Sequence, residues 1–367
     1  GTMFLAELGA EVIKIEAPEG DPSRQVGPYR LGKDDSEYFQ AWNLGKRSVT
    51  LDLKSESGKV AAKALIKSAD VLIENFRAGT MERLGLGYDQ VKGDNPGLVY
   101  CAITGFGTDG PYAARPGYDT VGQAMSGLLS LLTDLNDPKP MGISLSDHLS
   151  GIIASQGVLA ALVARGRTGK GQRVDTSLLE ATLSFCGENA ANYFENGKTP
   201  NRAMRTHRAQ VYAFVDRDGK PFVVHLSSPD KFWQGLTRVV GRPEWPADPR
   251  FATKETRGKN YQALHEGLQA VFRTNTREHW LGLLLAEDVP SAPLNNFDDV
   301  FNDPQVKHLE AAVEVTHPRL GRQRVLGQMV KLTRTPAGMA SATPGKLVAM
   351  SLISSAVRSI SAKIGSL

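Results

Sequence analysis

The sequence has few of the residue clusters from which metal and disulfide sites are built. Only two cysteines occur among its 367 residues, Cys101 and Cys186, and both lie in apolar stretches far apart in the chain. This number and spacing exclude a disulfide framework and a thiolate metal site. The seven histidines are scattered and no two lie four residues apart, so we predict no metal site.

Several common enzyme signatures are also missing. The sequence has no phosphate-binding loop, no zinc-protease motif and no hydrolase-type nucleophile elbow. The glycine-rich segment Gly105–Gly110 is similar to a dinucleotide fingerprint, but no helix pattern follows it directly. We therefore expect no nicotinamide and no flavin.

Long apolar runs and a strong excess of one charge are absent as well. The longest apolar runs, Gly127–Thr133 and Gly157–Ala164, fall far short of the ~20 residues that cross a bilayer. The net charge of +4 is mild and dispersed, whereas nucleic-acid binding favours a concentrated basic face. Together with the scarcity of cysteine, these features predict a cytoplasmic protein without a membrane or nucleic-acid partner.

The first half of the chain does contain an alternation of helices with short apolar strands. We expect strands at residues 11–16, 47–53, 69–74, 98–104 and 172–177, and helices at residues 1–9 and 57–68. Strands separated by helices of this length predict a parallel, doubly wound sheet, as in Rossmann-like α/β proteins. Because residue 1 already lies in a helical pattern, we expect a first strand and a turn to precede it.

The rest of the chain changes character twice. A strand at residues 141–145 is expected to lead into a helix at 146–164 that Ser146 or Asp147 caps, and another helix is expected at 178–196. After about residue 200, two apolar runs around the turn Asp216–Gly219 predict a β-hairpin. We therefore divide the chain into a large Rossmann-like domain (1–200), a small α+β domain (201–310) and a segment that returns to the large domain (311–367).

Charged and polar side chains follow three of the predicted strands. Glu16, Lys54 and the pair Asn75 and Phe76 lie at these strand ends, and Arg83 lies on the segment that follows. In an open parallel sheet the ligand crevice lies beyond the carboxyl ends of the strands. Cations bind phosphates and an aromatic ring stacks on a base. The set therefore indicates a phosphorylated, adenine-bearing ligand, although each residue alone is more typical of a solvated loop.

Asp147 lies between the predicted strand at 141–145 and an apolar helix. A carboxylate at a helix start often accepts hydrogen bonds from the backbone amides there. A carboxylate also acts as a nucleophile when it is desolvated and an activated acyl group is held against it. The residues around Asp147 leave both interpretations open.

A series of short motifs runs along most of the chain. These motifs are Leu8–Glu16, Gly20–Arg24, Asn43–Lys54, Asp70–Arg77, Gly79–Gly87, Thr104–Pro111, Gly117–Asp119, Gly142–Gly151 and Thr168–Gln172. With them the sequence resembles the family III CoA-transferases of the CaiB/BaiF type, which include formyl-CoA transferase. The resemblance extends from Gly1 to about Gly345, and the overall likeness is greatest to the succinyl-CoA-dependent dicarboxylate transferases.

The resemblance implies roles for particular residues. Asp147 is implied as the catalytic nucleophile, and Tyr118 as a catalytic residue beside the acyl site. The residues implied for the coenzyme A site are Leu51, Lys54, Asn75, Phe76 and Arg83, together with Ala17. Lys54 and Arg83 would lie near phosphates, whereas Ala17 matches an arginine of some members and implies that one phosphate contact is absent. The family fold implies an interlocked homodimer in which each chain forms a ring threaded through the other.

The resemblance also implies a reaction without a metal or a redox cofactor, in which coenzyme A is a substrate. Asp147 attacks the donor thioester and gives a mixed anhydride and CoA thiolate. The thiolate then attacks the aspartyl carbonyl, which gives an aspartyl-CoA thioester and frees the donor acid. The acceptor carboxylate reverses these steps. Backbone N–H groups at the start of the Asp147 helix are expected to stabilise the oxyanions.

Two alternative functions stay open. The α-methylacyl-CoA racemases share the fold and the aspartate, but they exchange an α-proton with acid and base groups. Their histidine base matches Tyr118 here, which favours the transferase, and His148 is the substitute base that the sequence offers. The other alternative is an inactive CoA-binding homologue, because residues 346–367 match no family segment and have the pattern of an amphipathic helix.

The substrate acids are indicated only by class. The glycine-rich loop of formyl-CoA transferase has no counterpart at residues 206–210, which counts against formyl and oxalyl substrates. The basic residues of this region are Arg202, Arg205, His207 and Arg208. They predict either a solvated linker or a clamp for a second carboxylate, and the clamp favours dicarboxylic acids.

Overall fold

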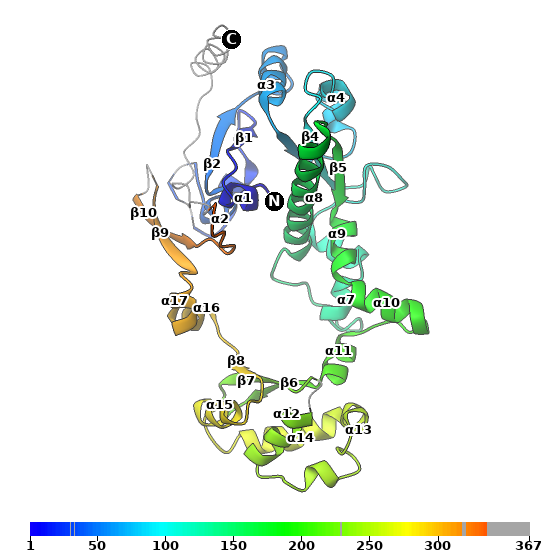
Figure 1. The fold of residues 1–367 in the computed structure, drawn as a ribbon, viewed down its shortest axis with the longest axis vertical. Helices are drawn as coiled ribbons and strands as arrows, with labels where there is room; N and C mark the ends of the chain where they lie inside the picture. Colours follow the sequence, from blue (N-terminus) through cyan, green and yellow to red (C-terminus); the bar gives the residue numbers. More distant parts are fainter. Residues whose placement is uncertain (30, 33, 228–229, 318–320, 336–367) are drawn as a thin grey trace. The chain divides into compact units, whose positions relative to one another are not determined.

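The chain in this computed structural model divides into two units (Figure 1). The structure describes residues 1–29, 31–32, 34–227, 230–317 and 321–335. Of the described residues, unit 1 contains those within 1–129, 140–188 and 304–335, and unit 2 contains those within 130–139 and 189–303. Unit 2 thus starts before residue 201, where the small domain was predicted. The helix predicted at 346–367 lies outside the described residues.

Unit 1 contains all the parallel strands of the described chain. Its strands are β1 (Val12–Glu16), β2 (Lys46–Thr50), β3 (Val71–Glu74), β4 (Val99–Thr104), β5 (Arg173–Ser177), β9 (Ala312–His317) and β10 (Gly321–Leu326). Strand β1 pairs with β2 in one parallel sheet, and β3, β4 and β5 form a second parallel sheet in that order. The prediction of a mixed α/β fold with parallel strands is confirmed, but the strands form two ladders instead of one continuous sheet.

The helices of unit 1 lie between these strands and beside them. They are α1 (Thr2–Glu7), α2 (Glu37–Asn43), α3 (Glu56–Ser68), α4 (Thr80–Leu84), α5 (Tyr88–Val91), α6 (Asp119–Met125), α8 (Leu145–Thr168), α9 (Leu178–Phe185) and α17 (Pro304–His308), with the 3-10 turn η1 (Pro22–Gln25). Helices α7 (Leu128–Leu132) and α10 (Gly187–Asn196) cross the boundaries between the units.

Strand β4 contributes to two separate apolar cores because successive side chains of a strand point to opposite faces. Tyr100 and Ala102 join a core that helices α3, α4 and α5 complete. Val99 and Cys101 join a second core with Leu5 of α1 and three residues of α8. Helices therefore cover both faces of this sheet. Its strand ends are left as the free edge at which a site can form.

Helix α8 is the longest helix of the described residues, with 24 residues. By length and mean hydropathy it is the one described helix that meets the requirements for crossing a bilayer. Its buried positions include Ala154, Val158 and Ala161, which pack against β4 in the second core. This packing is that of the core helix of an α/β unit.

Two of the predicted elements are wrong. Residues 141–145 form no strand, because they have no partner strand and Met141 and Ile143 are exposed. The helix predicted over 178–196 is two helices, α9 and α10, which meet at Cys186 and Gly187. Helix α10 has no fully buried residue, so core packing does not hold it in line with α9.

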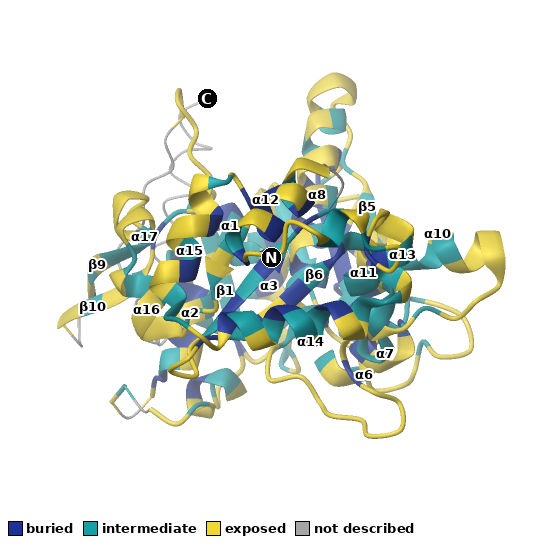
Figure 2. Ribbon diagram, turned by 90° about the horizontal axis from the view of Figure 1, so that it is seen from below, coloured by how far each residue is buried: buried dark blue, intermediate teal, exposed yellow. Residues whose placement is uncertain are grey.

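Unit 2 is an α+β unit with its own aromatic core. Its elements are α11 (Arg202–Ala209), β6 (Val211–Val215), β7 (Pro221–His225), α12 (Asp230–Val239), η2 (Trp245–Ala247), α13 (Lys254–Lys259), α14 (Tyr261–Phe272), α15 (Arg277–Ala286), β8 (Ser291–Pro293) and α16 (Phe297–Asn302). The predicted hairpin is confirmed as β6 paired antiparallel with β7. Figure 2 shows the buried faces of β6 and α14, which include Phe214 and Leu268.

Candidate active site

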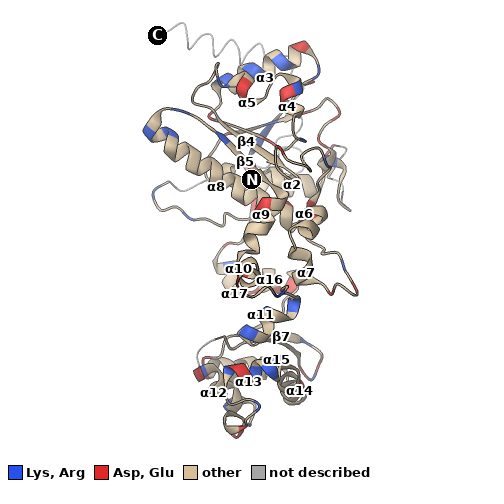
Figure 3. Cartoon of the chain, turned by 90° about the vertical axis from the view of Figure 1, so that its right-hand side faces the viewer, with Lys and Arg blue, Asp and Glu red and all other residues tan. Residues whose placement is uncertain are grey.

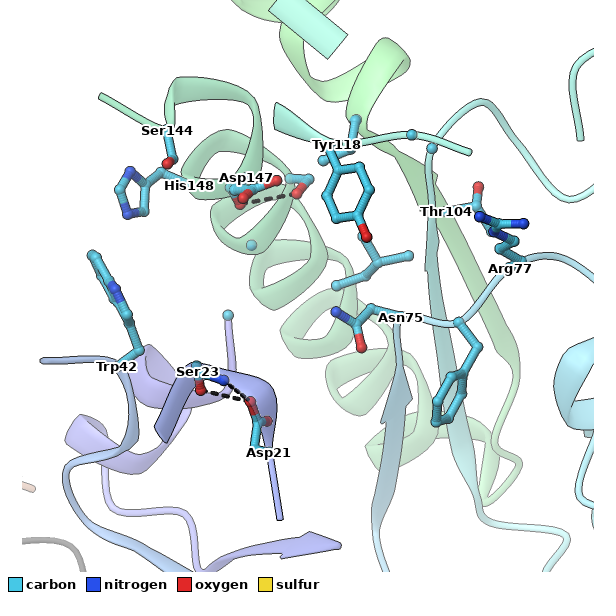
Figure 4. A pocket seen from close by; sticks show the side chains of 18 of the residues that line it. Asp21, Ser23, Trp42, Asn75, Arg77, Thr104, Tyr118, Ser144, Asp147 and His148 are labelled. Carbon is cyan, nitrogen blue, oxygen red and sulfur yellow. Dashed lines mark hydrogen bonds between the residues drawn. The ribbon is translucent and has the colours of Figure 1, made fainter. Parts of the chain in front are cut away.

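A cavity of about 660 Å³ lies at the carboxyl ends of the parallel strands of unit 1 (Figure 4). Asn75 directly follows β3, Thr104 ends β4 and Leu178 directly follows β5, and all three line the cavity. Ligand sites of open parallel sheets form at these ends, where the loops diverge. The topology therefore places the cavity where the sequence predicted a site.

The structure brings half of the predicted site residues to this cavity. Asp147, Tyr118, Asn75 and Phe76 line it. The two catalytic predictions thus share one cavity with two of the predicted CoA contacts, although they come from different parts of the chain.

The other four predicted residues lie away from the cavity lining. Leu51 is buried in the apolar core with α3, and Ala17 is exposed just after β1. Lys54 is exposed just before α3, and the Arg83 guanidinium donates a hydrogen bond to Thr80 Oγ1 at 2.8 Å. Their assignment to a CoA site stays a prediction.

Asp147 lies in the first turn of α8, and its carboxylate is open to the cavity. None of the described residues donates a hydrogen bond to this carboxylate. Partial burial of the Asp147 carboxyl and the nearby charge of Asp119 together raise the pKa of Asp147 to about 6. A carboxylate without a hydrogen-bond donor and with reduced solvation is suited to attack an acyl carbon.

The predicted cap of this helix is wrong, and the reason lies in a distant residue. The N-cap is Ser144, and its side chain makes no capping hydrogen bond. Instead, Asp119 Oδ1 accepts hydrogen bonds from the backbone N–H groups of Ser146 and Asp147, at 2.8 and 3.2 Å. Asp119 thus does what the sequence assigned to Ser146 or Asp147, and the Asp147 side chain is left free.

The same contacts correct the predicted oxyanion donors. In the first turn of α8, the N–H groups of Ser146 and Asp147 donate to Asp119, and that of His148 donates to the Ser144 carbonyl at 3.2 Å. The N–H of Leu145 donates to the Ile143 carbonyl at 3.0 Å. These backbone amides therefore have no free hydrogen for a substrate oxygen.

Aromatic side chains surround the carboxylate. Tyr118, the N-cap residue of α6, is 78% exposed and extends into the cavity near Asn75 (Figure 4). The His148 ring packs against Trp42 at 4.5 Å between ring centroids, and both rings line the cavity. Burial lowers the pKa of His148. His148 is therefore held in a packing contact, as expected for a residue with a structural role.

Four cationic side chains line the cavity and make it suitable for an anion. They are Lys14, Lys46, Arg77 and Arg115. Lys14 pairs with Asp21 at 2.5 Å, whereas Lys46 is 8% exposed and its ammonium donates to Asn43 Oδ1 at 3.0 Å. Burial and the nearby Lys14 lower the pKa of Lys46 to about 8. The motif Asn43–Lys54 contains Lys46, but no pattern in the sequence indicated that Lys46 lies at this cavity.

The turn after β3 is held by its own glutamate. Glu74 Oε2 accepts a hydrogen bond from the Phe76 N–H at 2.8 Å. Burial raises the pKa of Glu74 to about 7, although this hydrogen bond acts in the opposite direction. The contact fixes the backbone from which Asn75 and Phe76 reach the cavity.

Glu16 does not belong to the crevice, although it ends β1. Its carboxylate accepts two hydrogen bonds from the Arg24 guanidinium, both at 2.7 Å, and one from Ser48 Oγ at 2.6 Å. The side chain is fully buried in this ion pair. Glu16 therefore joins β1, β2 and η1 and is not available to a ligand.

The basic residues predicted as a carboxylate clamp lie in unit 2. Arg202, Arg205, His207 and Arg208 all belong to α11, a short helix rich in basic side chains (Figure 3). No group of three or more histidine, cysteine or acidic residues suited to hold a metal ion occurs among the described residues.

Comparison with known proteins identifies the family. The family described as CoA-transferase family III matches residues 1–346. An acetyl-CoA:oxalate CoA-transferase from Acetobacter aceti is 40% identical over 311 residues, which cover 83% of this chain and 79% of that protein. A succinyl-CoA:glutarate CoA-transferase from Mus musculus is 33% identical over 347 residues, which cover 94% and 79%.

A solved structure agrees with these sequences. The crystal structure of a CaiB/BaiF family protein from Brucella suis superimposes with a TM-score of 0.83 at 34% identity, and the match covers 97% of this chain and 93% of that one. The resemblance predicted from the motifs is confirmed: the chain belongs to CoA-transferase family III and is a CoA-transferase.

Proposed function

We propose that this enzyme moves CoA from an acyl-CoA to a dicarboxylic acid through covalent intermediates on Asp147. The observation that carries the proposal is the state of the Asp147 carboxylate. It is open to a cavity lined by cations, it accepts no hydrogen bond from the described residues, and its pKa is raised to about 6. Such a carboxylate is ionised at neutral pH, and its lone pairs are not occupied by a hydrogen-bond donor of the described residues, which favours nucleophilic attack.

Each half of the proposed reaction exchanges one acyl bond for another. An Asp147 oxygen attacks the donor thioester carbonyl, the carbon–sulfur bond breaks, and an anhydride and CoA thiolate form. The thiolate attacks the aspartyl carbonyl, and the donor acid leaves with the bridging oxygen. The acceptor carboxylate then attacks the aspartyl-CoA thioester, and the returned thiolate attacks the acceptor carbonyl of the new anhydride. Asp147 is regenerated, and no net proton transfer or redox step is needed.

The enzyme contributes mainly positioning and charge stabilisation to these steps. Because the backbone amides of α8 are occupied, we assign oxyanion stabilisation to side chains of the cavity. Tyr118 and Asn75 carry suitable donors, and the cations of the lining favour anionic substrates. We keep Asn75, Phe76, Leu51, Lys54, Arg83 and Ala17 as the proposed CoA contacts, because they lie in the motifs that resemble the family and because Asn75 and Phe76 line the cavity.

The dicarboxylate class of the acceptor rests on relatives. The two relatives described above are named for oxalate and glutarate as acceptors. A panel of oxalate, succinate and glutarate with acetyl-CoA and succinyl-CoA as donors tests the class. We expect dicarboxylates to be used with a higher kcat/KM than acetate or butyrate. Equal use of monocarboxylates would contradict the class but not the mechanism.

The proposal extends to the state of the protein in the cell. We propose an interlocked homodimer in the cytoplasm, with no nucleic-acid or membrane partner. The mild net charge and the packing of α8 in a core support the absence of nucleic-acid and membrane partners, and the homodimer rests on the membership of the family. Light scattering after size exclusion is expected to give twice the mass of the chain, and a monomer at micromolar concentration would contradict it.

Trapping of the intermediate tests the central proposal. After addition of a donor acyl-CoA, hydroxylamine is expected to convert Asp147 into a hydroxamate that mass spectrometry finds in the peptide containing it. The Asp147→Ala variant is expected to lose transfer by at least about a thousandfold. Asp94→Ala, which removes an exposed carboxylate elsewhere in unit 1, serves as the control.

Full transferase activity in Asp147→Ala would contradict the mechanism. Solvent deuterium at the α-carbon without acid exchange would indicate the racemase reaction instead.

A further inference from the structure

Asp119 binds the start of α8 with one carboxylate oxygen, and its other oxygen accepts a hydrogen bond within α6. Its Oδ1 accepts the N–H groups of Ser146 and Asp147, at 2.8 and 3.2 Å. Its Oδ2 accepts a hydrogen bond from Gln123 Nε2 at 2.6 Å. The same Gln123 nitrogen lies 3.1 Å from the Ile143 carbonyl, just before α8. A carboxylate on one helix thus binds the backbone amides that a capping side chain would bind at the start of another, although 28 residues separate Asp119 from Asp147.

Close packing keeps α6 against α8 at this point. A Cβ atom on Gly122 would lie 2.9 Å from Ser146 Oγ and 3.0 Å from Ser146 Cβ, so the two helices approach at a distance that only glycine permits. Ser146 Oγ in turn accepts a hydrogen bond from Thr182 Oγ1 of α9 at 2.8 Å. Helices α6, α8 and α9 therefore form one rigid support for the first turn of α8.

An acidic residue at the third position of a helix has an alternative to facing a cavity. Its side chain can fold back to the N-terminal amides or the N-cap N–H, as in a capping box. A carboxylate held by such hydrogen bonds has its lone pairs occupied and is a weaker nucleophile. In this structure the amides of Ser146 and Asp147 are already bound by Asp119.

We propose that Asp119 is a positioning residue, which caps α8 in place of Asp147 and so keeps the Asp147 carboxylate free and directed into the cavity. Asp119 also follows Tyr118 directly, so the same contact fixes the backbone from which Tyr118 enters the cavity. This inference rests on the proposed function, in which Asp147 is the nucleophile.

The charge of Asp119 has a second effect at the same place. It adds to burial in raising the pKa of Asp147. The other titratable or charged groups that line the cavity with Asp147 are the Gly1 α-amino group, Lys14, Asp21, Tyr38, Lys46, Arg77, Arg115, Tyr118 and His148, and Glu180 lies on the neighbouring α9. Glu180 accepts the Ser177 hydroxyl at 2.6 Å. The charge of Asp119, which is hydrogen-bonded to the Asp147 backbone, adds to burial in raising the pKa of Asp147.

Two substitutions separate the cap from the charge. In Asp119→Asn, the side-chain oxygen can still accept the N–H of Ser146. Gln123 can turn its amide and present Oε1, which has no hydrogen-bond partner, to the new Asn amide. Asp119→Asn therefore keeps the cap without the charge, whereas Asp119→Ala removes both. Asp216→Asn is the matched control, because Asp216 likewise accepts backbone N–H groups of Asp218 and Lys220 but lies in unit 2.

The test measures kcat, KM for the donor acyl-CoA and the pH profile of kcat/KM in all variants. We expect Asp119→Ala to lose about 10- to 100-fold in kcat with KM changed by less than about twofold, as for a misplaced reacting group. Asp119→Asn should keep most of the kcat that Asp119→Ala loses, and it should move the acidic limb of the kcat/KM profile to lower pH. Asp216→Asn should leave kcat and the acidic limb unchanged.

Either of two results would overturn the inference. One is wild-type kcat in Asp119→Ala, and the other is an acidic limb in Asp119→Asn that coincides with that of the wild type. Should Asp119→Ala fail to fold, the acidic limb of Asp119→Asn decides alone. A failure of the proposed function can be told apart from a failure of this inference. The former would appear as transfer activity in Asp147→Ala, whereas the latter would appear only in the Asp119 variants.

Discussion

At the scale of residues, the environment of Asp147 favours its reactivity over the stability of the fold. A pKa raised to about 6 means that the folded protein holds a proton on this group more tightly than the unfolded chain does. The free energy of unfolding therefore falls as the pH rises from about 4 to about 6, and the loss persists at higher pH. Active sites commonly carry such a loss.

Asp147→Asn removes the ionisable carboxyl and with it the loss in free energy of unfolding that ionisation of Asp147 causes. The variant is expected to be more stable than the wild type at pH 8, by about 1 kcal/mol after allowance for solvent screening of a carboxylate open to the cavity. The difference should vanish below about pH 4, where the wild-type carboxylate is protonated in both states. Urea unfolding at pH 4 and pH 8, with Asp94→Asn as the control, measures it. A variant less stable than the wild type at pH 8 would contradict this account.

The same titration predicts the pH dependence of catalysis. Because attack needs the ionised carboxylate, kcat/KM for the donor is expected to fall about tenfold per pH unit below about pH 6. Glu74, whose pKa is raised to about 7, holds the turn of Asn75 and Phe76. Its protonation is not expected to alter the slope of this limb, which Glu74→Gln tests directly. If the acidic limb of kcat/KM moved in Glu74→Gln, our assignment of that limb to Asp147 would be wrong.

The sequence could predict Asp147 and Tyr118 because each lies in a motif of the family. It could not predict the capping role of Asp119, although Asp119 lies in the same motif as Tyr118. That role depends on a hydrogen bond to a helix 27 residues further along, and local patterns carry no information on such contacts. The occupied amides of α8 follow from the same contact, so the predicted oxyanion donors failed for the same reason.

At the scale of elements, the contact between α6 and α8 is the one on which the site most depends. Gly122→Ala places a methyl group 2.9 Å from Ser146 Oγ and 3.1 Å from Leu178 Cβ. We expect a loss of about 1–3 kcal/mol in the free energy of unfolding. We also expect a lower kcat, because α6 carries Asp119.

Gly166→Ala is the matched control for this substitution. Gly166 lies in α8, and a Cβ atom there would contact nothing within 4 Å. Alanine in a helix is expected to stabilise by about 0.5–1 kcal/mol relative to glycine. Thermal unfolding and kcat of both variants are the measurements. Equal behaviour of the two would show that the close approach of α6 to α8 is unimportant.

The elements themselves were predictable where hydrophobic periodicity and burial coincide. Strand β4 was expected at residues 98–104 and lies at Val99–Thr104, with both faces in apolar cores. Residues 141–145 have the same apolar character but no partner strand, and periodicity alone cannot reveal that. The break between α9 and α10 was missed because helix propensity is continuous there, while core packing is not.

At the scale of the whole molecule, the two units have separate cores. The core of unit 2 is formed by residues between Tyr212 and Val289, and the cores of unit 1 contain none of these residues. The change from α/β alternation to a hairpin after residue 200 was the sequence feature from which a small domain was predicted, and that hairpin lies in unit 2. The exact boundary was not visible, because α10 continues across it without a turn residue.

Phe272→Ala tests this division. Phe272 is fully buried and packs against Phe214, Phe222 and Trp280. Its truncation is expected to destabilise unit 2 by about 3–5 kcal/mol. Trp233, Trp245 and Trp280 lie in unit 2, so tryptophan fluorescence should report the earlier transition. The exposed Phe297 gives the control Phe297→Ala. Unchanged unfolding of Phe272→Ala would contradict the assigned core.

The most direct measurement of the central claim follows oxygen atoms through one turnover. An acceptor acid labelled with oxygen-18 in its carboxylate is mixed with the donor acyl-CoA and a stoichiometric amount of enzyme. Attack on the aspartyl-CoA thioester places one acceptor oxygen in the anhydride bridge, and attack of the thiolate on the acceptor carbonyl leaves it on Asp147. Mass spectrometry should therefore find one oxygen-18 atom in the Asp147 peptide. A second, unlabelled turnover should transfer it to the released donor acid in about half of the molecules, because either carboxylate oxygen can attack. An Asp147 peptide without label after complete transfer would contradict the account.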